Sequence, residues 1–241
     1  MLVAAAVCPC PPLLVPQVAS GAAPELDAAR TACADAVGVL AASRPDRLYV
    51  VGPAGGTGRE SFPEGSAGSF AGFGADLSVR LGSGLPEGRL PDGGRPLPAS
   101  LAVAAWLLDR ERWAAAPATG LAVGERLDAA ACAAEGRGLA ASAGRVALLV
   151  MGDGSACRTL KAPGYLDERA APFDAAAGRA LAAADTEALL ALDEDLAHEL
   201  QVAGRAPWQV LAGAAEGAGL DGRLLHEDAP YGVGYFVAAW S

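Results

Sequence analysis

Residues 2–8 read LVAAAVC, a continuous apolar run that stops at Pro9, and residues 47–51 read RLYVV before Gly52. Short apolar runs bounded by turn residues are typical of buried strands in a parallel sheet. Between them, residues 25–43 carry apolar side chains at the spacing of one helix face. The order strand, helix, strand predicts a right-handed parallel crossover.

The rest of the chain continues this alternation. The strongest later strand is residues 145–151, RVALLVM. Further strands are predicted at 76–81, from Leu224, and at 232–240. Helices are predicted at 101–110, 127–142, 173–200 with a break near Asp185, and 208–216, and loops at 52–74 and 82–98. We therefore predict one α/β domain over residues 1–241, with a mostly parallel central sheet flanked by helices on both faces.

The composition excludes several functional classes. Of 241 residues, 52% are hydrophobic and 19% charged, which is enough to bury a core, and the net charge is −10. Such an acidic chain is a poor binder of nucleic acid or anionic membranes. Apolar runs of about 18 residues are missing from the sequence, so no membrane span is expected. The five cysteines are an odd number, and we predict a reducing, cytoplasmic location.

Chemically active side chains follow two of the predicted strands. Cys8 and Cys10 end the first strand, and two thiols at this spacing fit a soft metal or redox chemistry as well as plain packing. The later strand is followed by GDGSACR, residues 152–158, which offers Asp153, Ser155 and Cys157 as catalytic groups. Arg158 would hold an anion or favour a thiolate beside it. The alternative is a glycine-rich turn without chemistry.

Two other features carry weaker signals. Residues 52–59, GPAGGTGR, follow a strand but lack the spacing, lysine and hydroxyl of a phosphate loop, so a surface loop is the favoured interpretation. His226 and Glu227 precede the last strand and can supply a base and a carboxylate ligand, or simply a polar loop. The second histidine, His198, lies in a charged helical stretch and is predicted to be solvated.

The order of these motifs resembles the class III extradiol dioxygenase family, the subunit-B-like superfamily that also includes MEMO proteins. The resemblance rests on CPCPP at 8–12, VVGPAG at 50–55, MGDGS at 151–155 and APYGVGYFV at 229–237. It implies a subunit-B-like fold over nearly the whole chain and a pocket for a small molecule. It also implies assembly into a homodimer.

The same resemblance implies a non-haem Fe(II) centre whose usual histidines are replaced here. The first ligand position falls at Cys10, the second at Ala54, the acid/base at Ala156 and the late carboxylate near Glu227. Extradiol cleavage needs three protein ligands and a base. We therefore predict that ordinary extradiol activity is absent.

Three hypotheses follow. The first is an enzyme that uses a Cys10 or Cys157 thiolate with His226, Asp153 or Glu227 as base or orienting group. A variant of it is a metal such as zinc or iron held by Cys8, Cys10 and Glu227. The second is a non-catalytic binding protein without a cofactor, whose loop aromatics Phe62, Phe70 and Phe73 either dock a partner or fold onto the core. In the third, the pocket binds an acidic or phenolic metabolite through Arg158, Lys161 and Tyr165.

Overall fold

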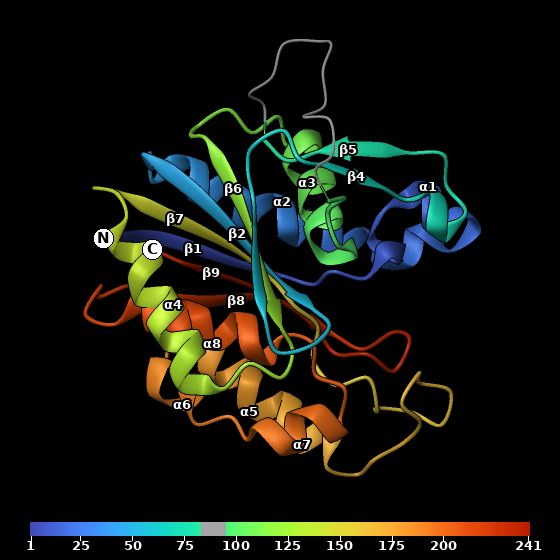
Figure 1. Cartoon of the computed structure of the whole chain (residues 1–241). Coiled ribbons are helices and arrows are strands. Elements are labelled where there is room, and N and C mark those ends of the chain that lie inside the picture. Colours follow the sequence, from blue (N-terminus) through green and yellow to red (C-terminus); the bar gives the residue numbers. More distant parts are fainter. Residues whose placement is uncertain (83–94) are drawn as a thin grey trace.

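The computed structural model describes residues 1–82 and 95–241, and its centre is one twisted sheet (Figure 1). In this part of the chain the sheet has seven strands in the order β3-β6-β2-β7-β1-β9-β8. Their bounds are β1 (Leu2–Cys8), β2 (Arg47–Ala54), β3 (Arg59–Phe62), β6 (Ala118–Gly124), β7 (Val146–Met151), β8 (Gly222–Asp228) and β9 (Tyr235–Trp240). A separate antiparallel pair, β4 (Ala67–Ser69) and β5 (Ser78–Arg80), lies beside the sheet.

The directions of the strands determine where a site can form. The four central strands β6, β2, β7 and β1 are parallel. Strand β3 is antiparallel to β6 at one side, and β9 is antiparallel to β1 at the other, followed by β8. The carboxyl ends of the four parallel strands and of β8 therefore share one edge of the sheet with the first residue of β9.

Helices cover both faces of the sheet (Figure 1). Helices α2 (Asp27–Ala42) and α3 (Ala99–Arg110) pack on one face, together with the short α1 (Pro16–Ala19) and 3₁₀ segments Pro12–Leu14, Ser20–Leu26 and Ala71–Phe73. The opposite face is covered by α4 (Ala129–Ala141), α5 (Ala170–Ala183), α6 (Thr186–Leu190), α7 (Glu194–Glu199) and α8 (Arg205–Ala215). The predicted α/β class with helices on both faces is confirmed.

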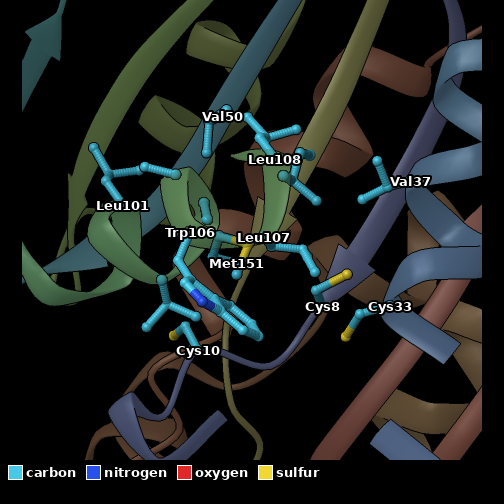
Figure 2. Packing of buried hydrophobic residues seen from close by; sticks show 14 of the residues in the cluster. Cys8, Cys10, Cys33, Val37, Val50, Leu101, Trp106, Leu107, Leu108 and Met151 are labelled. Carbon is cyan, nitrogen blue, oxygen red and sulfur yellow. The ribbon is translucent and has the colours of Figure 1, made fainter. Parts of the chain in front are cut away.

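Alternation along the buried strands divides the core into two layers. In β1, Ala4, Ala6 and Cys8 face the α2–α3 side, whereas Ala5 and Val7 face the α8 side. Figure 2 shows Cys8 and Cys33 with their sulfur atoms near each other in the first layer, among Val37, Leu107 and Met151. The second layer is built around large aromatic side chains, including Trp208, Phe236 and Trp240, each with 0% exposure. Both ends of the chain lie against the body of the fold.

Several local predictions were wrong. Strand β6 was predicted as neither strand nor helix, and the predicted loop 52–74 contains β3 and β4. The helical stretch 173–200 is three helices, not two, because Asp185 and Asp193 each cap a new helix through their side chains. The predicted loop 82–98 lies mostly outside the described residues.

The loop aromatics have different fates. Phe62 and Phe70 are buried, at 4% and 0% exposure, and thus belong to the core. Phe73 remains 45% exposed and contacts Phe70 with ring centroids 6.4 Å apart. The partner-docking interpretation therefore keeps only one of its three residues. In the described residues, every helix is too short or too polar to cross a membrane.

Candidate functional site

Asp153 occupies the turn that follows β7, at the carboxyl edge of the sheet. In open α/β sheets this edge is where ligands bind. The turn is held in place because the Gly152 amide donates to the Cys8 carbonyl at 3.0 Å, and the Gly204 amide donates to the Asp153 carbonyl at 2.8 Å. The Cys10 amide donates to Asp153 Oδ1 at 2.8 Å. The ends of β1 and β7 and the start of α8 thus fix one carboxyl group.

The Asp153 carboxyl is the titrating group of this site. Burial raises its pKa from 3.8 to about 7, although the hydrogen bond from the Cys10 amide acts in the opposite direction. At neutral pH the group therefore exchanges between its protonated and ionised forms. A pKa near the working pH is what general acid–base catalysis requires.

Tyr235 and Cys10 border Asp153. Tyr235 is only 2% exposed, and burial followed by the charge of Asp153 raises the pKa of its phenol. Among the described residues no hydrogen bond involves the Tyr235 hydroxyl. Burial also raises the pKa of the Cys10 thiol well above its ordinary value, with further contributions from Asp153 and Glu125. Burial and two carboxylates thus favour the protonated thiol of Cys10 over the predicted thiolate.

Ser155 and Arg158 bind the buried carboxylate of Asp174, so their side chains are not free for catalysis. Asp174 of α5 has 0% exposure and accepts from the Ser155 amide and hydroxyl, both at 2.8 Å. Arg158 Nη1 donates to the same carboxylate at 2.9 Å. Gly154 must be a glycine because a Cβ there would lie 2.7 Å from Phe236 and 2.9 Å from Asp174. The network holds the turn against α5, and it engages the charge of Arg158.

Cys157 is also a protonated thiol. Its Sγ donates to the Leu200 carbonyl at 3.5 Å. Burial raises its pKa first, Asp167 and Asp174 raise it further, and Arg169 lowers it. The predicted activation by Arg158 fails because that guanidinium pairs with Asp174. Cys157 lies in the core layer under α8 and Cys10 in the layer under α3, so the two thiols do not form one site.

The predicted metal ligands Cys8, Cys10 and Glu227 are not brought together. Cys8 is fully buried against Cys33, which raises its pKa well above the ordinary value. Glu227 extends toward α5, since its Oε2 lies 3.4 Å from the Cβ position of Gly178, on the opposite face from Cys10. Within residues 1–82 and 95–241, no group of three His, Cys, Asp or Glu side chains could hold a metal ion.

An iron centre of the extradiol type does not fit these residues. Of the positions expected from the resemblance, Ala54 offers no ligand atom, Cys10 is a buried protonated thiol, and Glu227 is on the other face. Ala156, at the acid/base position, has no titratable group. We therefore derive no step through iron or zinc.

The remaining predicted residues lie away from this cluster or on the surface. His226 pairs with Val237 in the β8–β9 ladder, two residues further from the edge than the Asp228–Tyr235 pair. Lys161 is exposed, and Tyr165 is 62% exposed with a φ of 65°. The structure shows no buried contact for either side chain. Their role in substrate binding stays a prediction.

A cavity lies between Glu125, which follows β6, and the segment from α7 to the start of α8. It has a volume of about 260 Å³ and is lined by Glu125, Ala197, His198, Gln201, Val202 and Ala203. Asp153, Cys10 and Tyr235 are not among its lining residues. Glu125 raises the pKa of Cys10, and the Gly204 amide, next to the lining segment, donates to the Asp153 backbone carbonyl. Glu125 and Tyr235 were not predicted as site residues, and His198 was predicted only as a solvated surface residue. A carboxylate directly after an apolar segment could have indicated Glu125 only if β6 had been predicted.

Arg205 fixes the wall that carries Glu125. The side chain is 2% exposed and donates to the backbone carbonyls of Glu125 and Leu127 and to Gln209. Its Nε has no hydrogen-bond partner among the residues that the structure describes. This buried guanidinium binds backbone carbonyls, and so it holds α8 against the segment that follows β6.

Comparison with known proteins supports the fold and nothing finer. No protein-family model and no curated protein matches the chain. Among solved structures, the chain is similar to the crystal structure of uncharacterized protein JW3007 from Escherichia coli K12. The two share 15% sequence identity over 99% of each chain, with a TM-score of 0.54. The similarity shows the α/β fold alone, and the assignment of a function depends on the site.

Proposed function

We propose that this chain binds a small molecule at the carboxyl edge of its sheet and transfers a proton to or from it through Asp153, without iron. In this proposal the chain is a class III extradiol dioxygenase-like protein that has kept the pocket and abandoned ring cleavage. The observation that carries the proposal is a carboxyl group held at 2.8 Å by the Cys10 amide with a pKa of about 7. The position of this carboxyl at the carboxyl edge of the sheet, where open α/β sheets bind ligands, supports the proposal.

The roles of the neighbouring residues follow from their contacts. The Cys10 amide orients Asp153 and leaves Oδ2 free to accept or donate a proton. The Tyr235 hydroxyl is available to hydrogen-bond a ligand. The Ser155–Asp174–Arg158 network holds the turn rigid, so that Asp153 does not need to reorganise when a ligand binds. The alternatives based on a thiolate at Cys10 or Cys157 are disfavoured because both pKa values are raised.

Two measurements test this proposal. In ¹³C NMR of the carboxyl groups, Asp153 should titrate near pH 7, and its signal should be missing in Asp153→Asn. Catechol supplied with Fe(II) under anaerobic reconstitution, followed by oxygen, should produce no ring-cleavage absorbance. An Asp153 pKa near 4, or catechol-dependent oxygen uptake with Fe(II), would overturn the proposal.

The predicted homodimer is a separate matter. Sedimentation velocity of the purified protein measures it directly, and a monomer across micromolar concentrations would contradict it.

A further inference from the structure

Two thiols from different elements meet in the core layer under α2 and α3. Cys8 is the last residue of β1, and Cys33 lies within α2. Each side chain has 0% exposure, and a hydrogen bond joins the two. Figure 2 shows them next to each other, with their sulfur atoms close together. Cys33 was not predicted as a partner of Cys8, because the two residues lie far apart along the chain.

The surroundings of this pair narrow its chemistry. The neighbouring side chains are apolar and include Val37, Leu107 and Met151. The hydrogen bond with Cys33 and burial raise the pKa of Cys8 well above its ordinary value, so the native pair is a poor nucleophile. In the described parts of the chain, no third side chain completes a metal site with these two thiols. A bond between the two sulfur atoms is the reaction that remains open to them.

Such a bond would tie α2 to the end of β1. The chain between the two cysteines passes through the short helix α1 and the 3₁₀ segments Pro12–Leu14 and Ser20–Leu26 before it enters α2. Closing this stretch into a loop removes conformational freedom from the unfolded chain, which stabilises the folded state. The Cys8 carbonyl accepts from the Gly152 amide at 3.0 Å, so the bond would lie at the carboxyl edge of the sheet.

We infer that Cys8 and Cys33 form a reversible disulfide, a redox latch between β1 and α2, when the protein equilibrates with a low-molecular-weight disulfide such as oxidised glutathione. One protein thiol loses its proton and attacks the glutathione disulfide, which releases one glutathione thiol and leaves a mixed disulfide. The second protein thiol loses its proton and displaces the other glutathione. The two cysteines are oxidised, and one glutathione disulfide is reduced to two thiols. The inference does not depend on proton transfer by Asp153.

Burial controls the rate of this exchange, and the fold controls its equilibrium. Both sulfur atoms are inaccessible in the closed protein, so exchange proceeds through opening of the chain and is slow. The folded state holds the two thiols together, whereas the unfolded chain must close the loop first. Loop closure of this length favours the disulfide about a hundredfold more in the folded chain than in the unfolded chain. The latch therefore responds to sustained oxidising conditions and not to brief ones.

The test equilibrates the full chain at pH 8 with mixtures of reduced and oxidised glutathione. Samples start from reduced and from oxidised protein, with and without urea, and are alkylated with N-ethylmaleimide before mass spectrometry. The folded protein should lose two hydrogen atoms and show a bridge between tryptic peptides 1–30 and 31–47, which carry Cys8 and Cys33. Both starting points should reach the same ratio, about a hundredfold more oxidised than in urea. The oxidised protein should also unfold at a higher urea concentration than the reduced protein.

Three variants locate the bond. Cys8→Ala and Cys33→Ala should each abolish the bridge and remove the effect of oxidation on the urea midpoint. Cys10→Ala is the matched control, because Cys10 is buried in the same core layer and lies on the same tryptic peptide as Cys8, and it should keep the bridge. Circular dichroism verifies that each variant is folded, and the wild-type peptide map tests the inference without any variant.

The opposite results are equally clear. A wild-type protein that stays reduced, or that carries only mixed disulfides with glutathione, would overturn the inference. A bridge that persists in Cys8→Ala and disappears in Cys10→Ala would assign the bond to Cys10 and also overturn it. Equal oxidation of the folded and the urea-unfolded chain would show that the fold does not hold the two thiols together.

Discussion

Replacing Asp153 with asparagine should remove a pH-dependent loss of stability from the protein. The carboxyl has a pKa of about 7 in the folded chain against an ordinary value of 3.8. Between these values the folded state keeps a proton that the unfolded chain has already lost. Because the folded-state pKa is raised, the stabilisation is complete below pH 3.8 and is lost as the pH rises to 7.

The size of the effect follows from the width of this window. Each pH unit inside it corresponds to about 1.4 kcal/mol. From pH 5.5 to pH 8 the wild-type chain should lose about 2 kcal/mol of unfolding free energy through Asp153. Asparagine stays neutral, and its amide oxygen can accept the same bond from the Cys10 amide. The stability of the variant relative to the wild type should therefore increase by about 2 kcal/mol between pH 5.5 and pH 8.

Urea denaturation, monitored by tryptophan fluorescence, measures the unfolding free energy of each protein, since Trp208 and Trp240 are fully buried in the folded state. Titrations in half-unit steps from pH 5.5 to 8 give the slope for each protein. Asp167→Asn serves as control, because the Arg169 guanidinium lowers the pKa of Asp167 to about 2, outside the window. Parallel slopes for the wild type and Asp153→Asn would refute the argument.

Three further predictions concern the structure around the site. Asp174→Ala should lower the unfolding free energy by about 3–5 kcal/mol, since it leaves a guanidinium and a buried hydroxyl unpaired; an unchanged urea midpoint would argue against the network. Arg205→Met should cost about 2 kcal/mol by leaving two carbonyls unsatisfied and should speed hydrogen exchange at residues 125–127; slow exchange there would mean that the Arg205 contacts are dispensable. Iodoacetamide at pH 7.5 should label none of the five buried cysteines until urea unfolds the chain; mass spectrometry showing a modified Cys10 in the native protein would contradict its raised pKa.

The fold was predictable where a buried strand appears in the sequence as a continuous apolar run. Strands β1 and β7 are continuous apolar runs, and the structure places both within a residue of the predicted bounds. Strand β6 reads ATGLAVG, which is not a continuous apolar run of large side chains. Gly120 is needed there because a Cβ would lie 3.1 Å from Leu101 and Leu81, a packing demand invisible along the chain. Strand order also depends on contacts between distant segments and was not predicted.

The position of Asp153 was predictable, and its contacts were not. A glycine-rich turn after a parallel strand indicated Asp153, and the structure places its carboxyl at the carboxyl edge of the sheet. Adjacency in sequence misled the assignment of Cys157, because the neighbouring Arg158 turns toward Asp174, which lies in the middle of a helix. An aspartate at such a position is normally taken as part of a solvated helix face. Only the packing of α5 shows that its carboxylate is fully buried.

Strand β1 pairs with two strands, β7 and β9, that are synthesised long after it. One side of it pairs with β7 in the middle of the chain, and the other with β9 at residues 235–240. Until β7 emerges, an apolar strand with both backbone edges open must stay unpaired, and its second edge stays open until residues 235–240 have been made. Strand β1 therefore gains one partner with β7 and the other only with β9, and until then the open edge of LVAAAVC must be shielded from other open strands.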